Sequence, residues 1–192
     1  DVHGVSIMVL YPKDGVRDIQ KKSMLTQSGN NVNVVGIDGN FDDCQNIVKE
    51  IFNSKIFSNK LLNANDFKPI KLSSANSINW GRLLPQIVYY ISAYAQMVKD
   101  GKLVAGRTID VCVPTGNFGN ILAAWYAKKI VTPIDKLFCA SNSNNVLTDF
   151  INTGVYDNSN REFIATPSPS MDILISSNLE RQLFELTGRN SK

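Results

Sequence analysis

Residues 114–120 are the segment of this chain with the clearest chemical potential, and they read Pro-Thr-Gly-Asn-Phe-Gly-Asn. They follow a run rich in β-branched residues and precede an apolar helical pattern, which predicts a strand-to-helix turn. Gly116 and Gly119 would let the backbone take conformations that a side chain forbids, so the amides of residues 117–120 could converge where the helix starts. Unpaired N–H groups and the helix dipole both attract anions there, which predicts a phosphate site. A plain tight turn with Asn117 as helix cap fits these residues equally well.

This turn lacks the signatures of the common nucleotide-binding loops. It contains no lysine, so it does not match the triphosphate-binding loop that ends in Gly-Lys-Ser/Thr. It also lacks the third glycine of the dinucleotide fingerprint, as does the segment at Gly36 and Gly39. A nucleotide triphosphatase or a nicotinamide enzyme is therefore poorly supported.

A second polar segment, residues 76–82, stands where a loop should enter a long helix. Asn76, Ser77 and Asn79 carry short hydrogen-bonding side chains, and the guanidinium of Arg82 could reach an anion in forked geometry. On residue types alone the simpler interpretation is favoured, in which Ser77 or Asn79 caps the helix and Arg82 is solvated. Two phosphate-suited helix starts in one chain nevertheless suggest a site for two phosphates.

Composition excludes several classes of function. The chain has 192 residues, 43% hydrophobic and 19% charged, with a net charge of +3 from scattered basic residues, which argues against nucleic-acid binding. No apolar run reaches the roughly 20 residues that span a bilayer, so a soluble, cytoplasmic protein with no membrane partner is expected. Its single histidine is His3, and Cys44, Cys112 and Cys139 are widely spaced, so no metal site is expected. Catalysis would then depend on lysine, carboxylates or a cofactor.

The elements that must position these segments alternate between strand and helix patterns. Expected strands are 5–10, 32–37, 70–72, 109–113 and 136–140, with a turn at 11–15; expected helices are 16–27, 41–52, a long one with its apolar stripe at 83–98 that ends before Gly101, 121–130 and 146–151, besides a short helical patch within 53–66. Such alternation predicts βαβ units and a parallel sheet covered on both faces. The polar stretch near residues 68–78 is the expected internal boundary.

Taken together, several segments resemble threonine synthase of the bacterial and fungal type. The similar segments are Tyr-Pro-Lys-Asp-Gly at 11–15, Val-Gly-Ile-Asp-Gly-Asn-Phe-Asp-Asp at 35–43, Ser-Ser-Ala-Asn-Ser-Ile-Asn-Trp-Gly-Arg-Leu-Leu-Pro-Gln at 73–86, Val-Pro-Thr-Gly-Asn-Phe-Gly-Asn at 113–120, Ser-Met-Asp-Ile-Leu at 170–174 and Asn-Leu-Glu-Arg at 178–181. The resemblance runs across nearly the whole chain.

The resemblance implies an α/β pyridoxal-phosphate enzyme of fold-type II, similar to the tryptophan synthase β chain. Residues 1–72 would be part of a smaller domain and residues 73–192 part of the large cofactor-binding domain, both open and twisted. The implied reaction is that of a lyase in threonine biosynthesis, which converts O-phosphohomoserine and water to threonine and phosphate.

The resemblance also implies the site residues, with pyridoxal 5'-phosphate as cofactor and no metal. The cofactor phosphate would be held by Gly116, Asn117, Phe118, Gly119 and Asn120. The substrate phosphate would be held by Asn76, Ser77, Asn79 and Arg82, of which Asn76, Ser77 and Arg82 match the family's pattern best. Arg82 would contribute most to neutralising the departing phosphate, because it offers full charge and two donors.

One departure from the family is expected to matter. Its Schiff-base lysine lies in a Phe-Lys-Asp context upstream of the region represented here, as does its loop for the substrate carboxylate. Phe-Lys-Pro at 67–69 stands at the wrong place in the order of motifs, and Lys68 is interpreted as a surface lysine. We therefore expect a fragment with no catalytic residue of its own, inactive without the remainder of its polypeptide. A threonine-synthase-like phospho-lyase and a non-catalytic phosphate-binding module are the alternatives.

Overall fold

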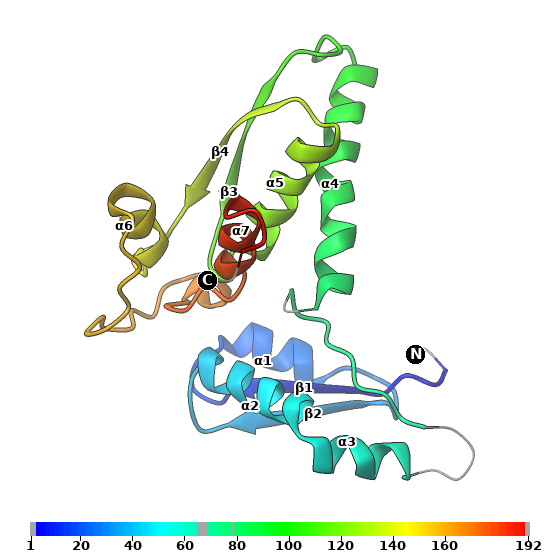
Figure 1. The fold of residues 1–192 in the computed structure, drawn as a ribbon. Coiled ribbons are helices and arrows are strands. Elements are labelled where there is room, and N and C mark those ends of the chain that lie inside the picture. Colours follow the sequence, from blue (N-terminus) through cyan, green and yellow to red (C-terminus); the bar gives the residue numbers. More distant parts are fainter. Residues whose placement is uncertain (1–2, 65–68, 78, 191–192) are drawn as a thin grey trace. The chain divides into compact units, whose positions relative to one another are not determined.

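The computed structural model describes residues 3–64, 69–77 and 79–190, which fall into two compact units (Figure 1). Unit 1 comprises Asp1–Leu72 with Pro167–Pro169, and unit 2 comprises Ser73–Thr166 with Ser170–Lys192. The elements are, in chain order, β1 (Ile7–Pro12), α1 (Asp18–Leu25), β2 (Val32–Ile37), α2 (Phe41–Asn53), α3 (Lys55–Leu62), α4 (Trp80–Lys99), β3 (Ile109–Pro114), α5 (Gly119–Ile130), β4 (Ile134–Ala140), α6 (Val146–Thr153), the 3-10 turn η1 (Pro169–Met171) and α7 (Leu179–Leu186).

Unit 1 is built on one parallel strand pair. β1 and β2 run from Ile7 opposite Val32 to Pro12 opposite Ile37, and α1 makes the crossover that a parallel pair requires. α2 packs on β1 and begins with a reciprocal cap, in which Asn40 Oδ1 accepts from the amides of Asp42 (2.8 Å) and Asp43 (3.1 Å). An apolar run rich in β-branched residues predicted β2, and apolar residues at spacings of three and four predicted α2. Both elements are confirmed.

Two local predictions in unit 1 are wrong. Tyr11 and Pro12, expected in a turn, complete β1 and are among its buried residues. Proline is tolerated there because it ends the strand, and the ladder continues with the Lys13 amide donating to Ile37 O at 3.0 Å. Residues 70–72, expected as a strand, form none; the Ile70 amide instead donates to Leu61 O (3.3 Å) at the end of α3. Lys68 lies outside the described residues.

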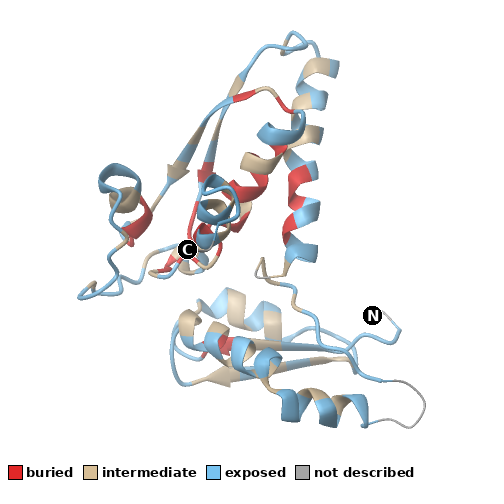
Figure 2. Cartoon of the chain, in the orientation of Figure 1, coloured by how far each residue is buried: buried red, intermediate tan, exposed pale blue. Residues whose placement is uncertain are grey.

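Unit 2 repeats the strand–helix–strand arrangement with a larger core. β3 and β4 pair in parallel from Ile109 opposite Ile134 to Pro114 opposite Ala140, and α5 connects them. α4 packs along α5, where Ala123, Ala124 and Ala127 are fully buried and allow a close approach. Figure 2 shows that burial is concentrated in the first half of α5 and on one face of α4. The core therefore lies directly behind the turn between β3 and α5.

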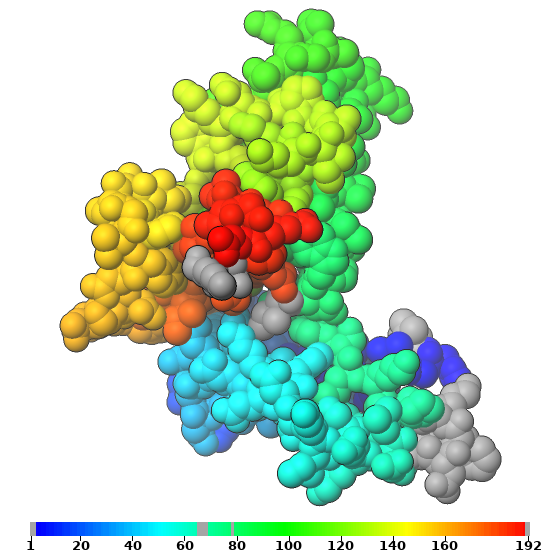
Figure 3. Space-filling view, in the orientation of Figure 1, coloured from blue at the N-terminus to red at the C-terminus, as the bar shows by residue number. Residues whose placement is uncertain are grey.

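The C-terminal part of the chain packs back onto this core. Beyond α6, the segment leading to η1 and α7 folds back so that α7 contacts α5. In the space-filling view α7 (red) lies on the surface of unit 2 beside α4 (green) (Figure 3). None of the helices that the structure describes has both the length and the apolar character needed to cross a lipid bilayer.

Candidate functional site

The turn between β3 and α5 has an unusual backbone, although not at its glycines. Phe118, the residue before the helix, is left-handed with φ +67°, whereas Gly116 and Gly119 are absent from the positive-φ residues of the described chain. The expectation that the glycines supply special backbone angles is therefore wrong. A left-handed phenylalanine is strained, and burial of its ring in the core, only 5% exposed, offsets that strain.

The two glycines serve close approach instead. A Cβ built on Gly119 would lie 2.5 Å from Cβ of Ser77, and one on Gly116 would lie 2.9 Å from Cδ1 of Ile173. Real Cβ atoms essentially never come this close to another heavy atom, so any side chain at either position forces its neighbour to move. Gly119 thereby lets Ser77 lie against the start of α5. The structure joins the two polar segments at this contact.

The amides of the turn are available to an anion. Within the described part of the chain, the N–H groups of Gly116, Asn117, Phe118 and Asn120 have no hydrogen-bond acceptor, while that of Gly119 donates to Asn117 Oδ1 at 3.1 Å. Left-handed Phe118 followed by helical Gly119 makes successive N–H groups converge into a concave nest. Asn117 thus caps one amide, as the simpler interpretation expected, and the others remain as an anion cup at the helix start.

The second polar segment divides into different roles. Ser77 lies against Gly119, and Ser77 Oγ accepts a hydrogen bond from Gln86 Nε2 at 3.2 Å. Asn79 is the cap of α4: its Oδ1 accepts from the Gly81 amide (2.9 Å) and its Nδ2 donates to Ser74 O (2.9 Å). Ile78, between them, lies outside the described residues. The structure therefore brings Ser77 to the turn and uses Asn79 to begin the helix.

Asn76 and Arg82 flank this segment. Asn76 is half-buried, and its carbonyl accepts from the amide of Asn79 at 2.9 Å. Arg82 lies in the first turn of α4 with an exposed side chain, whose NH1 approaches the hydroxyl of Tyr89 at 3.5 Å. This long contact leaves most of its five N–H donors to solvent or to a ligand.

The side chain of Asn120 is held by α4. Its Nδ2 donates to Gln86 Oε1 at 3.0 Å, and its Oδ1 accepts a short hydrogen bond from the hydroxyl of Tyr90. Gln86 in turn reaches Ser77, so a chain of polar side chains links the two segments. Burial raises the pKa of Tyr90, which keeps its phenol protonated as a donor. Asn120 therefore offers an anion its backbone amide rather than its side chain.

A third segment, residues 171–181, supports the turn and was given no role by the sequence. Ser176 Oγ donates to Gly116 O, while Asn178 donates to Asn117 O from both its amide and its Nδ2, each at 3.1 Å. Arg181 NH1 donates to Ser77 O at 2.8 Å and to Asn178 Oδ1 at 3.0 Å. The only signal for this segment was the resemblance at 170–174 and 178–181, which indicated similarity without a function.

A buried carboxylate anchors that segment. Asp172, 3% exposed, accepts at Oδ1 from Asn142 Nδ2 (2.7 Å) and Thr166 Oγ1 (2.7 Å), and at Oδ2 from the Thr166 amide (2.8 Å). Asn144 adds a longer bond to Oδ1 at 3.2 Å. These hydrogen bonds offset the cost of burying the polar side chain of Asp172. They also hold the neighbouring Ile173 against Gly116.

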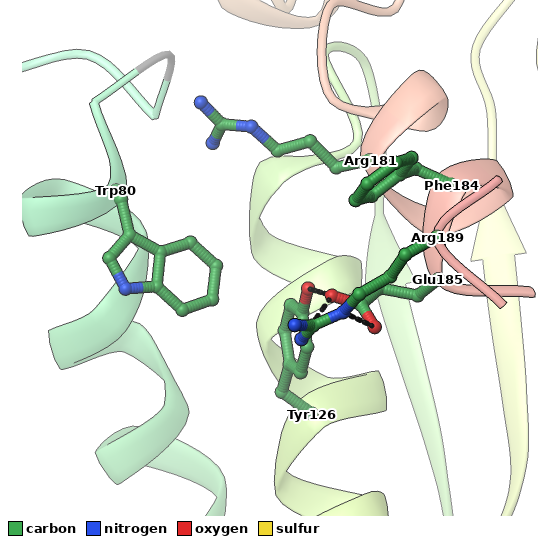
Figure 4. A pocket seen from close by; sticks show the side chains of 6 residues that line it. All are labelled: Trp80, Tyr126, Arg181, Phe184, Glu185 and Arg189. Carbon is green, nitrogen blue, oxygen red and sulfur yellow. Dashed lines mark hydrogen bonds and ion pairs between the residues drawn. The ribbon is translucent and has the colours of Figure 1, made fainter. Parts of the chain in front are cut away.

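A cavity in unit 2 is lined by no residue of the turn. It has a volume of about 340 Å³ and is lined by Trp80, Tyr126, Arg181, Phe184, Glu185 and Arg189 (Figure 4). Arg189 donates to both carboxylate oxygens of Glu185 at 3.2 and 3.1 Å, which lowers the pKa of Glu185, and Tyr126 adds a hydrogen bond to Oε1 at 3.2 Å. Burial, followed by the Glu185 charge, raises the pKa of Tyr126. Because these polar groups satisfy one another, the turn is the stronger candidate.

Metal binding finds no support in the described residues, where no group of three or more His, Cys, Asp or Glu side chains is placed to hold an ion. Cys44 is buried, Cys139 is half-buried and Cys112 is exposed. Burial raises the pKa of both Cys44 and Cys139, so these thiols stay protonated near neutral pH.

Comparison with known proteins confirms the resemblance and the fold class. No family model matches the chain. It is 49% identical over 192 residues to human "Threonine synthase-like 1", covering all of this chain and 25% of that protein, and 43% identical over 182 residues to threonine synthase of Saccharomyces cerevisiae, covering 95% of this chain and 33% of that protein.

A solved structure gives the same result. The crystal structure of PLP-bound threonine synthase from Brucella melitensis matches with a TM-score of 0.74 and 42% identity, over 96% of this chain and 36% of that one. The chain therefore spans a quarter of the length of the human relative and about a third of the length of the yeast enzyme.

Proposed function

Because the chain is homologous to part of the threonine synthases, we propose that its protein is a pyridoxal-phosphate-dependent lyase that converts O-phosphohomoserine and water to threonine and phosphate. In this proposal the chain supplies most of the phosphate-binding core, with unit 1 as part of a smaller domain and unit 2 as part of the large cofactor-binding domain. The observation that carries it is the cup of unpaired amides at the start of α5, with Ser77 held against it by Gly119.

The charge and the free amides of the turn support the cofactor phosphate as its ligand. Among the described residues, the N–H groups of Gly116, Asn117, Phe118 and Asn120 have no acceptor, and α5 is long enough to contribute its dipole. The cup carries no formal charge of its own, which suits a group that stays bound through many turnovers. When bound, pyridoxal 5'-phosphate supplies an electron sink that stabilises negative charge on the substrate carbon chain.

We assign the substrate phosphate to Asn76, Ser77 and Arg82, with Asn79 supporting them as the cap of α4. The Ser77 hydroxyl already accepts from Gln86, so its own proton can be donated to an anion. Arg82 is the exposed cation of this group and would neutralise phosphate as it departs. The contact between Ser77 and Gly119 would keep the two phosphates at adjoining helix starts.

A second candidate is a threonine-synthase-like phospho-lyase with another product. It is favoured by the 49% identity to the human protein named threonine synthase-like 1, compared with 43% to the yeast threonine synthase. The same phosphate contacts would serve both reactions, since each releases phosphate from a phosphorylated amino acid. The cytoplasmic location expected from the sequence stays a prediction, and so do the two expected partners, O-phosphohomoserine and the remainder of the same polypeptide.

The test is an assay of the full-length protein. With pyridoxal 5'-phosphate and O-phosphohomoserine, we expect equimolar release of inorganic phosphate and threonine. Phosphate release without threonine would support the phospho-lyase, and binding of the cofactor without any release would support a non-catalytic module. Failure to bind pyridoxal 5'-phosphate would overturn the proposal.

A further inference from the structure

Ser176 and Asn178 form hydrogen bonds with two carbonyl oxygens of the turn between β3 and α5. Ser176 Oγ donates to Gly116 O, and Asn178 donates twice to Asn117 O, at 3.1 Å from its amide and 3.1 Å from Nδ2. These partners are separated by 60 and 61 positions in sequence, so the contacts exist only in the folded unit. Two consecutive carbonyls are thus held on one side of the turn.

Because each trans peptide is planar, the direction of a carbonyl fixes the direction of the next N–H group. The C=O of Gly116 and the N–H of Asn117 belong to one peptide plane and point in opposite directions, as do the C=O of Asn117 and the N–H of Phe118. The described residues contain no cis peptide that would break this relation. Holding both carbonyls toward residues 176–178 therefore turns both N–H groups away from them, into the cup.

The supporting side chains are themselves fixed. Asn178 is fully buried, and its Oδ1 accepts from Arg181 NH1 at 3.0 Å, which orients its Nδ2 toward Asn117. Ser176 is 7% exposed, and its own amide donates to the hydroxyl of Tyr156 at 2.8 Å. Buried donors with a single available geometry hold a peptide plane more firmly than solvated ones.

We propose that Ser176 and Asn178 are positioning residues for the phosphate of the cofactor, acting through the peptide planes on either side of Asn117. The inference rests on the proposed function, because it names what orients the amides of that same site. Neither residue touches the phosphate. They fix the direction of two N–H donors, so that little reorganisation is needed when the anion binds.

Equilibrium binding to the full-length protein tests this with two ligands, pyridoxal 5'-phosphate and pyridoxal. Ser176→Ala and Asn178→Asp should each lower the affinity for pyridoxal 5'-phosphate by about 5- to 20-fold, the cost of one or two misdirected hydrogen bonds. Binding of pyridoxal should stay within about 2-fold, since it has no phosphate for the cup. Ser176→Thr, which keeps the hydroxyl, should restore the affinity.

Ser177→Ala is the matched control. Its hydroxyl is buried between the two positioning residues and has no partner in the described structure, so this variant should bind both ligands as the wild type does. Urea unfolding of the cofactor-free variants shows whether each one folds.

Equal weakening of both ligands, or no weakening of either, would overturn the positioning role. A wild-type protein that fails to distinguish the two ligands would instead contradict the proposed function, because the cup would then hold no phosphate.

Discussion

Ser77 occupies the space that a side chain on Gly119 would need, since the added Cβ would lie 2.5 Å from Ser77 Cβ and 2.6 Å from its Oγ. Gly119→Ala should therefore destabilise the protein by about 1–3 kcal/mol through overpacking. Removing the obstructing atoms of Ser77 should relieve that cost. The double variant Ser77→Gly/Gly119→Ala should therefore be more stable to urea than the sum of the two single effects predicts, with a coupling free energy of about 1 kcal/mol or more.

The control for this experiment is Gly81→Ala, which also changes a glycine in the first turn of a helix. The nearest atom to its added Cβ is a side-chain oxygen of Asn79 at 3.3 Å, which needs to move only a few tenths of an ångström. Additive effects of the two changes at 77 and 119 would contradict the close contact.

Phe118 gives a prediction about backbone strain. Both Phe118→Ala and Phe118→Gly remove the buried ring, at a cost of about 3–5 kcal/mol. The Phe118→Gly variant should lose about 1 kcal/mol less stability than Phe118→Ala, because only glycine adopts φ +67° without strain. Chemical denaturation measures the difference. At Ala127, inside α5, a change to glycine should instead lower stability by about 1 kcal/mol. A Phe118→Gly variant less stable than Phe118→Ala would refute the left-handed conformation.

Arg82 is expected to act on the substrate phosphate and not on the cofactor. Arg82→Ala should lower kcat/KM for O-phosphohomoserine by about 10- to 100-fold, as expected for loss of a charged hydrogen-bond donor. Arg82→Lys should recover only part, because lysine has no planar fork. Affinity for pyridoxal 5'-phosphate should not change. The control is Arg107→Ala, another exposed arginine of unit 2. Equal kinetic losses at 82 and 107 would argue against a specific role.

The Glu185–Arg189 pair predicts a pH dependence of stability. Hydrogen bonds from Arg189 lower the pKa of Glu185 in the folded protein. A carboxyl with a lowered folded-state pKa contributes stability above its unfolded pKa, about 4.3 for glutamate, and that contribution is lost as pH falls through the folded pKa. The stability difference between wild type and Glu185→Gln should thus be constant near neutrality, begin to fall below about pH 4, and be lost once the pH is below the lowered folded-state pKa.

Unfolding measured across this pH range tests the pair, with Glu180→Gln, an exposed position on the same helix, as control. A wild-type advantage that persists at low pH would exclude ionisation of Glu185 as its source.

The sequence by itself determined the elements whose signals are local. An apolar run rich in β-branched residues predicted the strand at 32–37, and apolar residues at spacings of three and four predicted the helix that begins at Phe41. Each of these signals depends on a single element. It also indicated that residues 114–120 form a turn suited to an anion, because a strand followed by a helix start exposes amides whatever surrounds it.

Tertiary structure decided how that turn is built. Gly119 is required by Ser77 and Gly116 is approached by Ile173, both neighbours from other segments, and neither glycine has a positive φ. The strand at Tyr11 and Pro12 exists because a partner strand lies beside it, which turn-forming residue types could not indicate. Arg181 reaches Ser77 across 104 positions, and Asn178 reaches Asn117 across 61. Such contacts leave no periodic pattern in the chain, because their geometry is set by folding and not by neighbouring residues.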